Sequence, residues 1–510
     1  MPDPSWAEGY VVDIGYTHGY FSELSPSAMN FITLLDGVRA IEPISPFTYY
    51  ELGCGNGRST ALHAAANPAG QFIGVDFNPM HIRNARDFAE EAGIGNVRFL
   101  EKNFAELLEM ELPEADMVAM HGVHSWISEE NRRQVVEFLR RRLKPGGLFY
   151  ISYNCLPGQA QVAPLQRLLT EYANLGGGTL PERIHGAIDF ARRLEQAGAD
   201  YFPINPYASS RLARMDGEDP SYLAHEYFNA NWAPAYHADV ARELAAAKLT
   251  YVGSAIIMDN FNQFVLKPEV AKLLAGISDR TMIETLKDFS RNQVFRRDVF
   301  ARGAAKMSAA ELEAMLDRTR FSLLRPRVLC KLKGKTPVGE VSLLQEAYAP
   351  VLDALARMPM TFADLAGANE TSRMNRTQIR QALFGLAALG NVAAALPADG
   401  EASRRAATDR YNAAVIARAA SLKGGAILAS PVLGAGVPAG FIDLLLLTEA
   451  WNEDGAVDRV MATISRHGHS IRKDGKVLDT DTAIREQVET RARSFFAELL
   501  PFFRMMGVAA

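Results

Sequence analysis

The sequence is poor in cysteine, with three in 510 residues, and these three lie far apart. Cys54, Cys155 and Cys330 have neither the spacing of metal ligands nor that of a disulfide framework, so we expect reduced thiols and no metal site. An excess of one charge is also missing, since the net charge is −5. This near balance gives the chain no overall attraction to nucleic acid or to an acidic membrane.

Targeting and membrane-spanning segments are missing as well. The first residues, MPDP, are polar and acidic and do not resemble a signal peptide. The most apolar tract, residues 424–447, is interrupted by Pro431 and Pro438 and carries Asp443, so we do not expect it to cross a bilayer as a helix. The sequence therefore predicts a cytoplasmic protein with two to four domains and a large core.

The sequence is organised around a glycine-rich stretch, ELGCGNG, at residues 51–57. Aromatic and β-prone residues at 47–52 predict a buried strand before it, and residues 58–66 predict a helix after it. Glycines have no Cβ, so the backbone at this turn can approach a ligand closely. A second strand, residues 71–75, ends on Asp76, where a β-α-β unit places the carboxylate that accepts hydrogen bonds from a ribose.

The spacing of the glycines distinguishes between nucleoside cofactors. A dinucleotide site requires G-x-G-x-x-G, but Arg58 occupies the third glycine position counted from Gly53, which disfavours NAD-dependent oxidoreduction. The pattern is instead E-x-G-x-G-x-G, and it resembles motif I of class I S-adenosylmethionine-dependent methyltransferases. The resemblance implies that the loop passes close to the amino-acid tail and the ribose of this cofactor.

The resemblance also implies which residues bind S-adenosyl-L-methionine and its product, S-adenosyl-L-homocysteine. They lie in the glycine loop and just after strands two, three (residues 96–100) and four (residues 116–120), and are Glu51, Gly53, Cys54, Gly55, Asn56, Gly57, Asp76, Phe77, Asn103, Phe104 and His121. In class I enzymes, a polar side chain and a backbone N–H after the third strand usually meet the adenine. Asn103 stands there, where many members carry Asp.

Candidate catalytic residues lie at the end of the fourth strand and in two outlying segments. The fourth strand leads into HGVHSW, and His121, His124 and an indole at the carboxyl end of a strand favour a functional role over core packing. The aromatic N-terminal segment carries Tyr16 and Tyr20, whose rings either line a methyl-transfer pocket or pack against the sheet edge. His225 is a further candidate, in YLAHEYF, with internal packing as the alternative.

The remaining elements predict an α/β fold, a class I, Rossmann-like methyltransferase sheet with a helical insert. The fifth strand is expected at residues 148–153, the last helix of the sheet at 237–248, and the last two strands at 250–257 and 293–301. Residues 156–235 are then an insert at the carboxyl edge of the sheet, where ligands bind. We interpret the insert as a cap over the substrate; the alternative is a surface elaboration.

A mostly α-helical C-terminal region follows, so the expected domains are 1–155 (methyltransferase core with an aromatic lid), 156–235 (cap), 236–306 (rest of the sheet), 307–400 (winged-helix-like) and 401–510 (helical). Residues 361–365 and 377–389 predict a helix-turn-helix pair, and residues 391–396 a wing strand. The second helix offers only Arg376 and Arg380, which favours protein binding or homodimerisation through this region over nucleic-acid binding.

As a whole, the chain resembles bacterial methyltransferases that carry a methyltransferase regulatory domain. The residues that carry the resemblance are 50–57, 121–126, SYNCLPG (152–158) and YLAHEY (222–227). The best-known members are rickettsial protein-lysine methyltransferases that modify outer-membrane protein. They have a Thr-His-Pro step in the N-terminal segment, whereas here Gly19 follows Thr17-His18.

This resemblance implies methyl transfer from S-adenosylmethionine to nitrogen or oxygen, with a protein, including its lysines, or a small molecule as acceptor. His121 is the favoured proton acceptor. The alternative is a regulatory protein that senses the cofactor and binds DNA or protein through the winged-helix-like domain.

Overall fold

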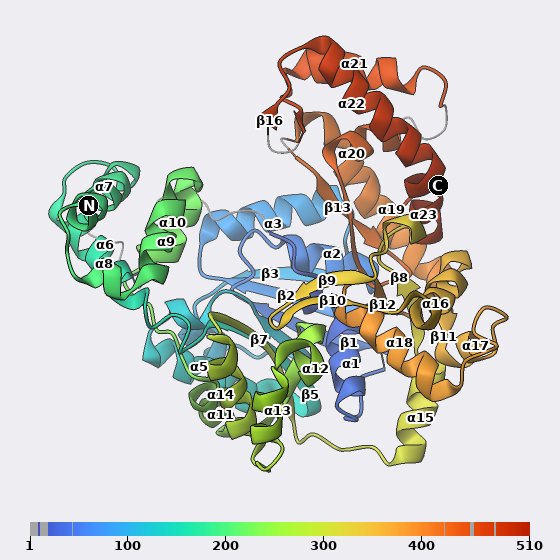
Figure 1. Cartoon of the computed structure of the whole chain (residues 1–510), viewed down its shortest axis with the longest axis horizontal. Helices are drawn as coiled ribbons and strands as arrows, with labels where there is room; N and C mark the ends of the chain where they lie inside the picture. The colour runs from blue at the N-terminus through green and yellow to red at the C-terminus, as the bar shows by residue number, and fades with distance from the viewer. Residues whose placement is uncertain are drawn as a thin grey trace.

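Apolar and aromatic strands form the sheet at the centre of the fold. The computed structural model describes residues 9–10, 19–42, 44–422, 424–448, 453–473 and 476–509. Within these residues, a seven-stranded sheet has the order β3-β2-β1-β4-β5-β7-β6 (Figure 1). Its strands are β1 (Phe47–Leu52), β2 (Gly70–Asp76), β3 (Val97–Glu101), β4 (Ala115–Met120), β5 (Leu143–Asn154), β6 (Leu249–Ser254) and β7 (Phe295–Arg302). Strand β7 is antiparallel to both neighbours and the other pairs are parallel, which confirms the expected α/β class.

Successive side chains of a strand face opposite sides of the sheet, and each side has its own core. Tyr49 of β1 packs with side chains of α1 (Pro26–Leu35) and α2 (Arg58–Ala66). Tyr50 packs on the other side, where the covering helices are α4 (Phe104–Glu109), α5 (Glu129–Arg142) and α11 (His237–Ala245). Strand β5 begins earlier than residue 148, because Leu143 already pairs with Ala115 of β4.

The insert between β5 and α11 is helical, as expected, and has a core of its own. It comprises α6 (Ala163–Leu175), α7 (Leu180–Gln196), α8 (Tyr201–Ile204), α9 (Pro206–Arg214) and α10 (Pro220–Tyr227). Figure 1 shows these helices, in green, at one end of the molecule. After β6 come α12 (Asn262–Val265), α13 (Pro268–Leu274) and α14 (Arg280–Arg291), which return the chain to β7.

The next region mixes helices with short strands. Its elements are α15 (Ala309–Arg318), β8 (Arg320–Leu323), β9 (Lys333–Thr336), β10 (Gly339–Ser342), α16 (Gln345–Arg357), β11 (Met360–Thr361), α17 (Phe362–Ala366), α18 (Arg376–Ala388) and β12 (Val392–Ala395). The expected helix pair is α17 and α18, and β12 follows it and pairs with β8. Its assignment as a winged helix stays a prediction. Strands β9 and β10 form an antiparallel hairpin before α16.

The last region was expected to be helical but also contains strands. It comprises α19 (Glu401–Ala417), β13 (Ala426–Ser430), β14 (Ala435–Ala439), α20 (Phe441–Thr448), α21 (Ala456–His467), β15 (Arg472–Lys473), β16 (Lys476–Val477), α22 (Asp481–Ser494) and α23 (Leu500–Met505). Between α22 and α23 the helix widens into a π-helical turn over Phe495–Leu499. The apolar tract expected not to span a membrane forms the hairpin β13–β14 and the helix α20. No helix in the described ranges is long and apolar enough to cross a bilayer.

The hairpin β13–β14 packs against α2, one of the helices that cover the seven-stranded sheet. The amide of Asn67, which follows α2, donates to the carbonyl of Gly434 at 2.9 Å, and the hydroxyl of Ser27 in α1 donates to the carbonyl of Leu433 at 2.9 Å. The C-terminal region is therefore joined to the helix that follows the glycine loop.

Candidate cofactor and methyl-transfer site

A cavity of about 130 Å³ opens at the carboxyl ends of β1, β2, β3 and β4. The described residues that line it all lie between positions 10 and 131, so the cap contributes none of them. They include every expected cofactor-binding residue except Gly57, and in addition Tyr10, Gly19, Phe21, Arg58, Ser59, Val75, His81, Lys102, Gly122, Val123, Trp126, Ile127 and Asn131. The residues expected to bind the cofactor, apart from Gly57, thus line one cavity.

Two glycines of the loop have distinct tasks. Gly53 has φ +73°, and a Cβ there would lie 2.4 Å from Cγ2 of Val123, so only glycine fits between the loop and the segment after β4. At Gly55 a Cβ would meet no described atom within 4 Å, and its N–H donates to Oδ2 of Asp76 at 2.9 Å. Gly53 therefore lets the loop pack, and Gly55 leaves space open to a ligand.

Asp76 ties the loop to the end of β2. Its Oδ2 accepts from Gly55, and its Oδ1 accepts from the N–H of Asn78 at 2.9 Å and lies 3.3 Å from Nδ1 of His81. Since each carboxylate oxygen has two lone pairs, these contacts leave one lone pair, on Oδ2, without a described partner. Asp76 is 7% exposed and lines the cavity, so this oxygen is placed to accept from a ribose hydroxyl.

His81 is a cavity residue that the sequence analysis missed. It is 5% exposed, and its Nε2 has no hydrogen-bond partner among the described residues. A histidine in the first turn of the helix that directly follows Asp76 was the signal for it. A buried nitrogen without a partner at a cavity wall fits a polar ligand there.

Glu51 is buried beneath the loop. The hydroxyl of Thr60 in α2 donates to it at 2.5 Å. Burial raises the pKa of the Glu51 carboxyl to about 7, with a smaller contribution from the negative charge of Asp76, and the bond from Thr60 opposes both. Near pH 7 the carboxyl is thus poised between its two forms, and a positive group brought beside it would favour the ionised one.

Asn103 lines the cavity but uses its polar groups elsewhere. Its side-chain oxygen accepts from the N–H of Glu106 at 2.8 Å, and its own N–H donates to the carboxylate of Glu106 at 3.0 Å. This capping box begins α4, so the side-chain oxygen and the backbone N–H of Asn103 are already engaged.

Among the candidate catalytic residues in the described ranges, only His121 lines the cavity. Its Nδ1 lies 2.7 Å from the hydroxyl of Tyr150, and the ring of Phe21 stacks on it with a centroid distance of 3.7 Å. Burial, and secondarily the positive charge of Arg297, lowers the pKa of His121 to about 3. The imidazole is therefore neutral at physiological pH.

The other candidates lie away from the cavity or outside the described residues. His124 turns toward α11, where its Nε2 lies 3.2 Å from the carboxylate of Glu243. Tyr20 accepts a hydrogen bond from the N–H of Gly436 at 2.5 Å. His225 is buried in the cap and packs against Tyr10, with a centroid distance of 5.4 Å. Tyr16 lies outside the described residues.

Tyr10 connects the cap to the cofactor cavity. Its ring lies 5.9 Å from that of Phe77, at the end of β2, on one side and contacts His225 on the other. The carbonyl of Gly9 accepts from the N–H of Ala230, just after the cap helices, at 2.8 Å. The N-terminal segment, rather than a cap side chain, is therefore what reaches the cavity.

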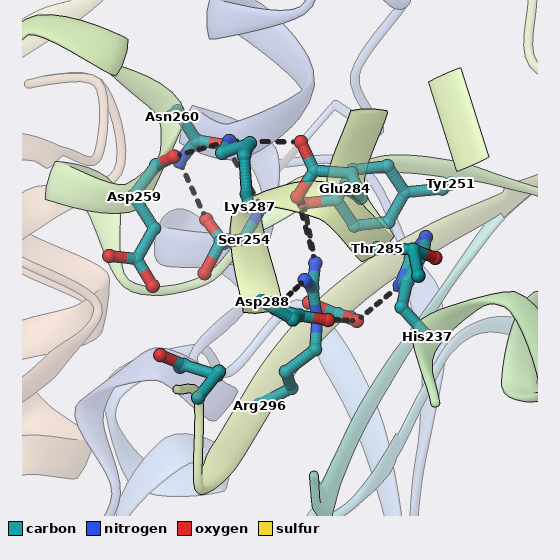
Figure 2. Close-up of polar contacts among 12 residues, drawn as sticks. His237, Tyr251, Ser254, Asp259, Asn260, Glu284, Thr285, Lys287, Asp288 and Arg296 are labelled. Atoms are coloured by element: carbon teal, nitrogen blue, oxygen red, sulfur yellow. Dashed lines mark hydrogen bonds and ion pairs between the residues drawn. The ribbon is translucent and has the colours of Figure 1, made fainter. Parts of the chain in front are cut away.

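A second group of polar residues lies outside the cavity, between α14 and β7. Figure 2 shows Arg296 extending toward Glu284 and Asp288 of α14, and its nitrogens lie 2.9 and 2.7 Å from these carboxylates. Asp298 accepts from Arg296 at 2.8 Å and lies 3.1 Å from Nδ1 of His237. Because these side chains are buried, the network fixes α11 and α14 on the sheet. No group of metal-ligating side chains was found among the described residues.

Comparison with known proteins decides the family. Residues 50–147 match the model of a methyltransferase domain, and residues 219–302 match that of a predicted methyltransferase regulatory domain. An uncharacterised protein of Synechocystis is 36% identical over 506 residues, which cover 99% of this chain and 100% of that protein. The chain is a class I S-adenosylmethionine-dependent methyltransferase. Its regulatory-domain match runs from the last cap helix to β7 and contains the network around Arg296.

A solved structure has the same fold as the methyltransferase. PKMT2 from Rickettsia typhi, solved in complex with AdoHcy, shares the fold, with a TM-score of 0.67 and 17% identity over 96% of this chain and 99% of that one. An uncharacterised protein of Rickettsia prowazekii is 23% identical over 58% of this chain and 53% of its own length. The cofactor of the methyltransferase is S-adenosylmethionine. The open space at Gly55, the unused lone pair of Asp76 and Nε2 of His81 fit this group.

Proposed function

We propose that this methyltransferase methylates an amine nitrogen, the side chain of a protein lysine, held beside His121. The observation that carries the proposal is the desolvation of the cavity wall. Burial that lowers the pKa of His121 to about 3 disfavours a positive charge at this wall. The same surroundings disfavour an ammonium and favour the neutral amine that can attack a methyl group.

The free energy needed to deprotonate a lysine at pH 7 supports the need for such a wall. Neutralising a lysine with a reference pKa near 10.4 costs about 4.6 kcal/mol at pH 7. Phe21, Trp126 and Tyr10 give the cavity aromatic surfaces that exclude water from the amine and lower this cost. The resemblance of the chain to rickettsial protein-lysine methyltransferases supports the same acceptor.

Each residue then has a task in the reaction. Bound S-adenosylmethionine would supply a methyl group on a positively charged sulfur. The lone pair of the amine would form the new N–C bond in line as the C–S bond breaks, and the sulfur would leave neutral. The loop at Gly55 and the carboxylate of Asp76 hold and align the cofactor. When Nδ1 of His121 donates to Tyr150, its Nε2 accepts a hydrogen bond from the amine and directs the lone pair toward the methyl group. With a pKa of about 3 the imidazole is a weak base, so we assign it this orienting task rather than storage of the proton.

The basic side chains of α18 favour this enzyme over a DNA-binding regulator. Arg380 pairs with Glu313 at 2.7 Å, and Arg376 pairs with Asp317. Both partners lie on α15, so the two arginines are neutralised within the fold and offer little to a phosphate backbone.

The test measures where the methyl group goes. The protein is incubated with methyl-labelled S-adenosylmethionine and a cell lysate, and the label is traced by mass spectrometry after separating proteins from small molecules. We expect label in methyl-lysine of protein. Label only in small molecules, or only in other amino acids, contradicts the proposal.

A matched pair of variants tests the role of His121. His121→Ala removes the hydrogen-bond acceptor, so transfer should fall by at least about tenfold while affinity for S-adenosylhomocysteine stays within about threefold. His124→Ala is the control, because this neighbouring ring faces Glu243 and not the cavity. Equal losses in both variants contradict the assignment.

A further inference from the structure

Residues 19–24, here called the strap, run between the cofactor cavity and the C-terminal region. Gly19 and Phe21 of the strap line the cavity, and Phe21 stacks on His121. Tyr20, between them, is not among the described residues that line the cavity. Its hydroxyl instead accepts from the N–H of Gly436 in β14 at 2.5 Å. Neighbouring residues of the strap thus face the methyl-transfer site and the C-terminal hairpin.

On its other side the strap is held by α2 through backbone groups. The N–H of Phe21 donates to the hydroxyl of Ser59 at 3.2 Å, and its carbonyl lies 3.4 Å from Nε2 of His63. Both contacts end at the backbone of Phe21, so neither holds its ring directly. Further along the strap, Glu23 pairs with Arg297 at 2.9 Å and the carbonyl of Leu24 accepts from the hydroxyl of Tyr49 at 3.0 Å. The bond from Tyr20 to Gly436 is the attachment that joins the residue next to Phe21 to the C-terminal hairpin.

The contact between Tyr20 and Gly436 is close enough to leave no room for a side chain at position 436. A Cβ on Gly436 would lie 2.8 Å from the ring of Tyr20 and 2.2 Å from Cγ2 of Ile427, so only glycine lets β14 approach this closely. Burial raises the pKa of the Tyr20 phenol far above its ordinary value, so the hydroxyl stays neutral. The hairpin β13–β14 also holds α2 itself, through Asn67 and Gly434. The hairpin therefore contacts both Tyr20 and the helix that holds the backbone of Phe21.

We propose that Tyr20 is a positioning residue for methyl transfer and that the hairpin β13–β14 completes the methyl-transfer site through it. The hairpin orients Tyr20, the strap carries this orientation to Phe21, and Phe21 fixes the plane of His121 and closes the acceptor side of the cavity. The C-terminal region, which has no residue in the cavity within the described ranges, thereby governs the rate. This inference rests on the proposed role of His121 in holding the acceptor.

The experiment uses three variants of the full chain. Tyr20→Phe removes the hydroxyl and keeps the ring, and Gly436→Ala disturbs the same contact from the hairpin. Tyr50→Phe is the matched control, because it removes a buried hydroxyl, bonded to the carbonyl of Pro113, on the other face of the sheet. For each variant, transfer of labelled methyl groups to lysate is measured at saturating cofactor. Affinity for S-adenosylhomocysteine, thermal stability and the ring resonances of isotope-labelled His121 are measured alongside.

We expect Tyr20→Phe to lower transfer by at least about fivefold with cofactor affinity within about threefold, while Tyr50→Phe changes neither. The resonances of His121 should move in Tyr20→Phe, because a reoriented Phe21 ring changes the magnetic environment of the stacked imidazole. A smaller fall in transfer, or a fall accompanied by equal losses of cofactor affinity and stability, overturns the inference.

Two further results are informative. Gly436→Ala should reproduce the effects of Tyr20→Phe; if it does not fold, Tyr20→Phe alone decides. If the parent protein labels nothing in the lysate, the proposed acceptor is wrong, and the resonances of His121 still test the strap. Unmoved resonances in Tyr20→Phe then overturn the positioning role.

Discussion

Replacing Asp76 by alanine should weaken cofactor binding and loosen the empty loop together. The carboxylate keeps one lone pair toward the cavity, so one charge-assisted hydrogen bond to the ribose is lost. Such a bond contributes about 1.5–3 kcal/mol, which corresponds to about 10- to 150-fold in the dissociation constant.

The same substitution also removes the acceptor of two backbone N–H groups, those of Gly55 and Asn78. A buried donor without an acceptor costs about 1–3 kcal/mol; Asn78 is buried, whereas Gly55 borders the open cavity, so the free energy of unfolding of the cofactor-free protein should fall by at least about 1 kcal/mol. Removing the Asp76 carboxylate should therefore affect the stability of the cofactor-free protein as well as the binding of the ribose. Asp76 is part of the loop's structure before any ligand arrives.

The assays are isothermal titration with S-adenosylhomocysteine and urea unfolding without ligand. Asp116→Ala is the matched control, because Asp116 accepts from the N–H of Thr48 at 2.8 Å and pairs with Lys144, but at the amino end of β4. This variant should lose stability and keep its cofactor affinity. Binding by Asp76→Ala within about twofold of the parent would refute the placement of the ribose.

Three more predictions concern the loop and the network around Arg296. Burial holds the pKa of Glu51 near 7, above an ordinary value of 4.5. The contribution of Glu51 to the free energy of unfolding is therefore full below pH 4.5 and is lost as the pH rises through 7. Glu51→Gln should reduce this fall of stability with pH, as measured by urea unfolding. Gly53→Ala should abolish binding of S-adenosylhomocysteine in titration, because the new methyl group meets Val123 at 2.4 Å and the backbone has φ +73°. Arg296→Met should cost about 3–5 kcal/mol of unfolding free energy in urea, because three buried carboxylates lose the positive charge that they share; a loss below about 1 kcal/mol would contradict the network's role.

The sheet was predictable from the sequence because local signals agree there. Apolar, aromatic runs such as residues 47–52 are long enough to identify a strand, and the glycine loop marks where it ends. The hairpin β13–β14 was missed because its strands, AILAS and AGVPA, are rich in small residues and show no alternation of polar and apolar side chains. These strands form because they are buried against α2, a contact that no local pattern reveals.

The candidate site divides in the same way. That the loop, Asp76 and His121 lie at one cavity was predictable, because all three follow the ends of neighbouring strands. His124 lies in the same segment after β4 as His121, but its ring turns to Glu243, which lies 119 residues further along the chain. The engagement of Asn103 was readable, since Asn followed three positions later by Glu is the pattern of a capping box. Phe21 acquires its place through contacts with α2 and with the ring of His121, which no local pattern reveals.

The packing of β14 on α2 also constrains the order of events during synthesis. Asn67 and Gly434 are 367 positions apart, and Tyr20 and Gly436 are 416 apart. At a translation rate of roughly 5–20 residues per second, α2 leaves the ribosome roughly 20–70 s before the strands that cover it. In the later part of that interval, once β7 has been made, the sheet and the glycine loop are complete while one flank of α2 faces water. The nascent chain therefore exposes an apolar surface beside its cofactor loop until β13 and β14 are made. Chaperones would be needed during this period of exposure.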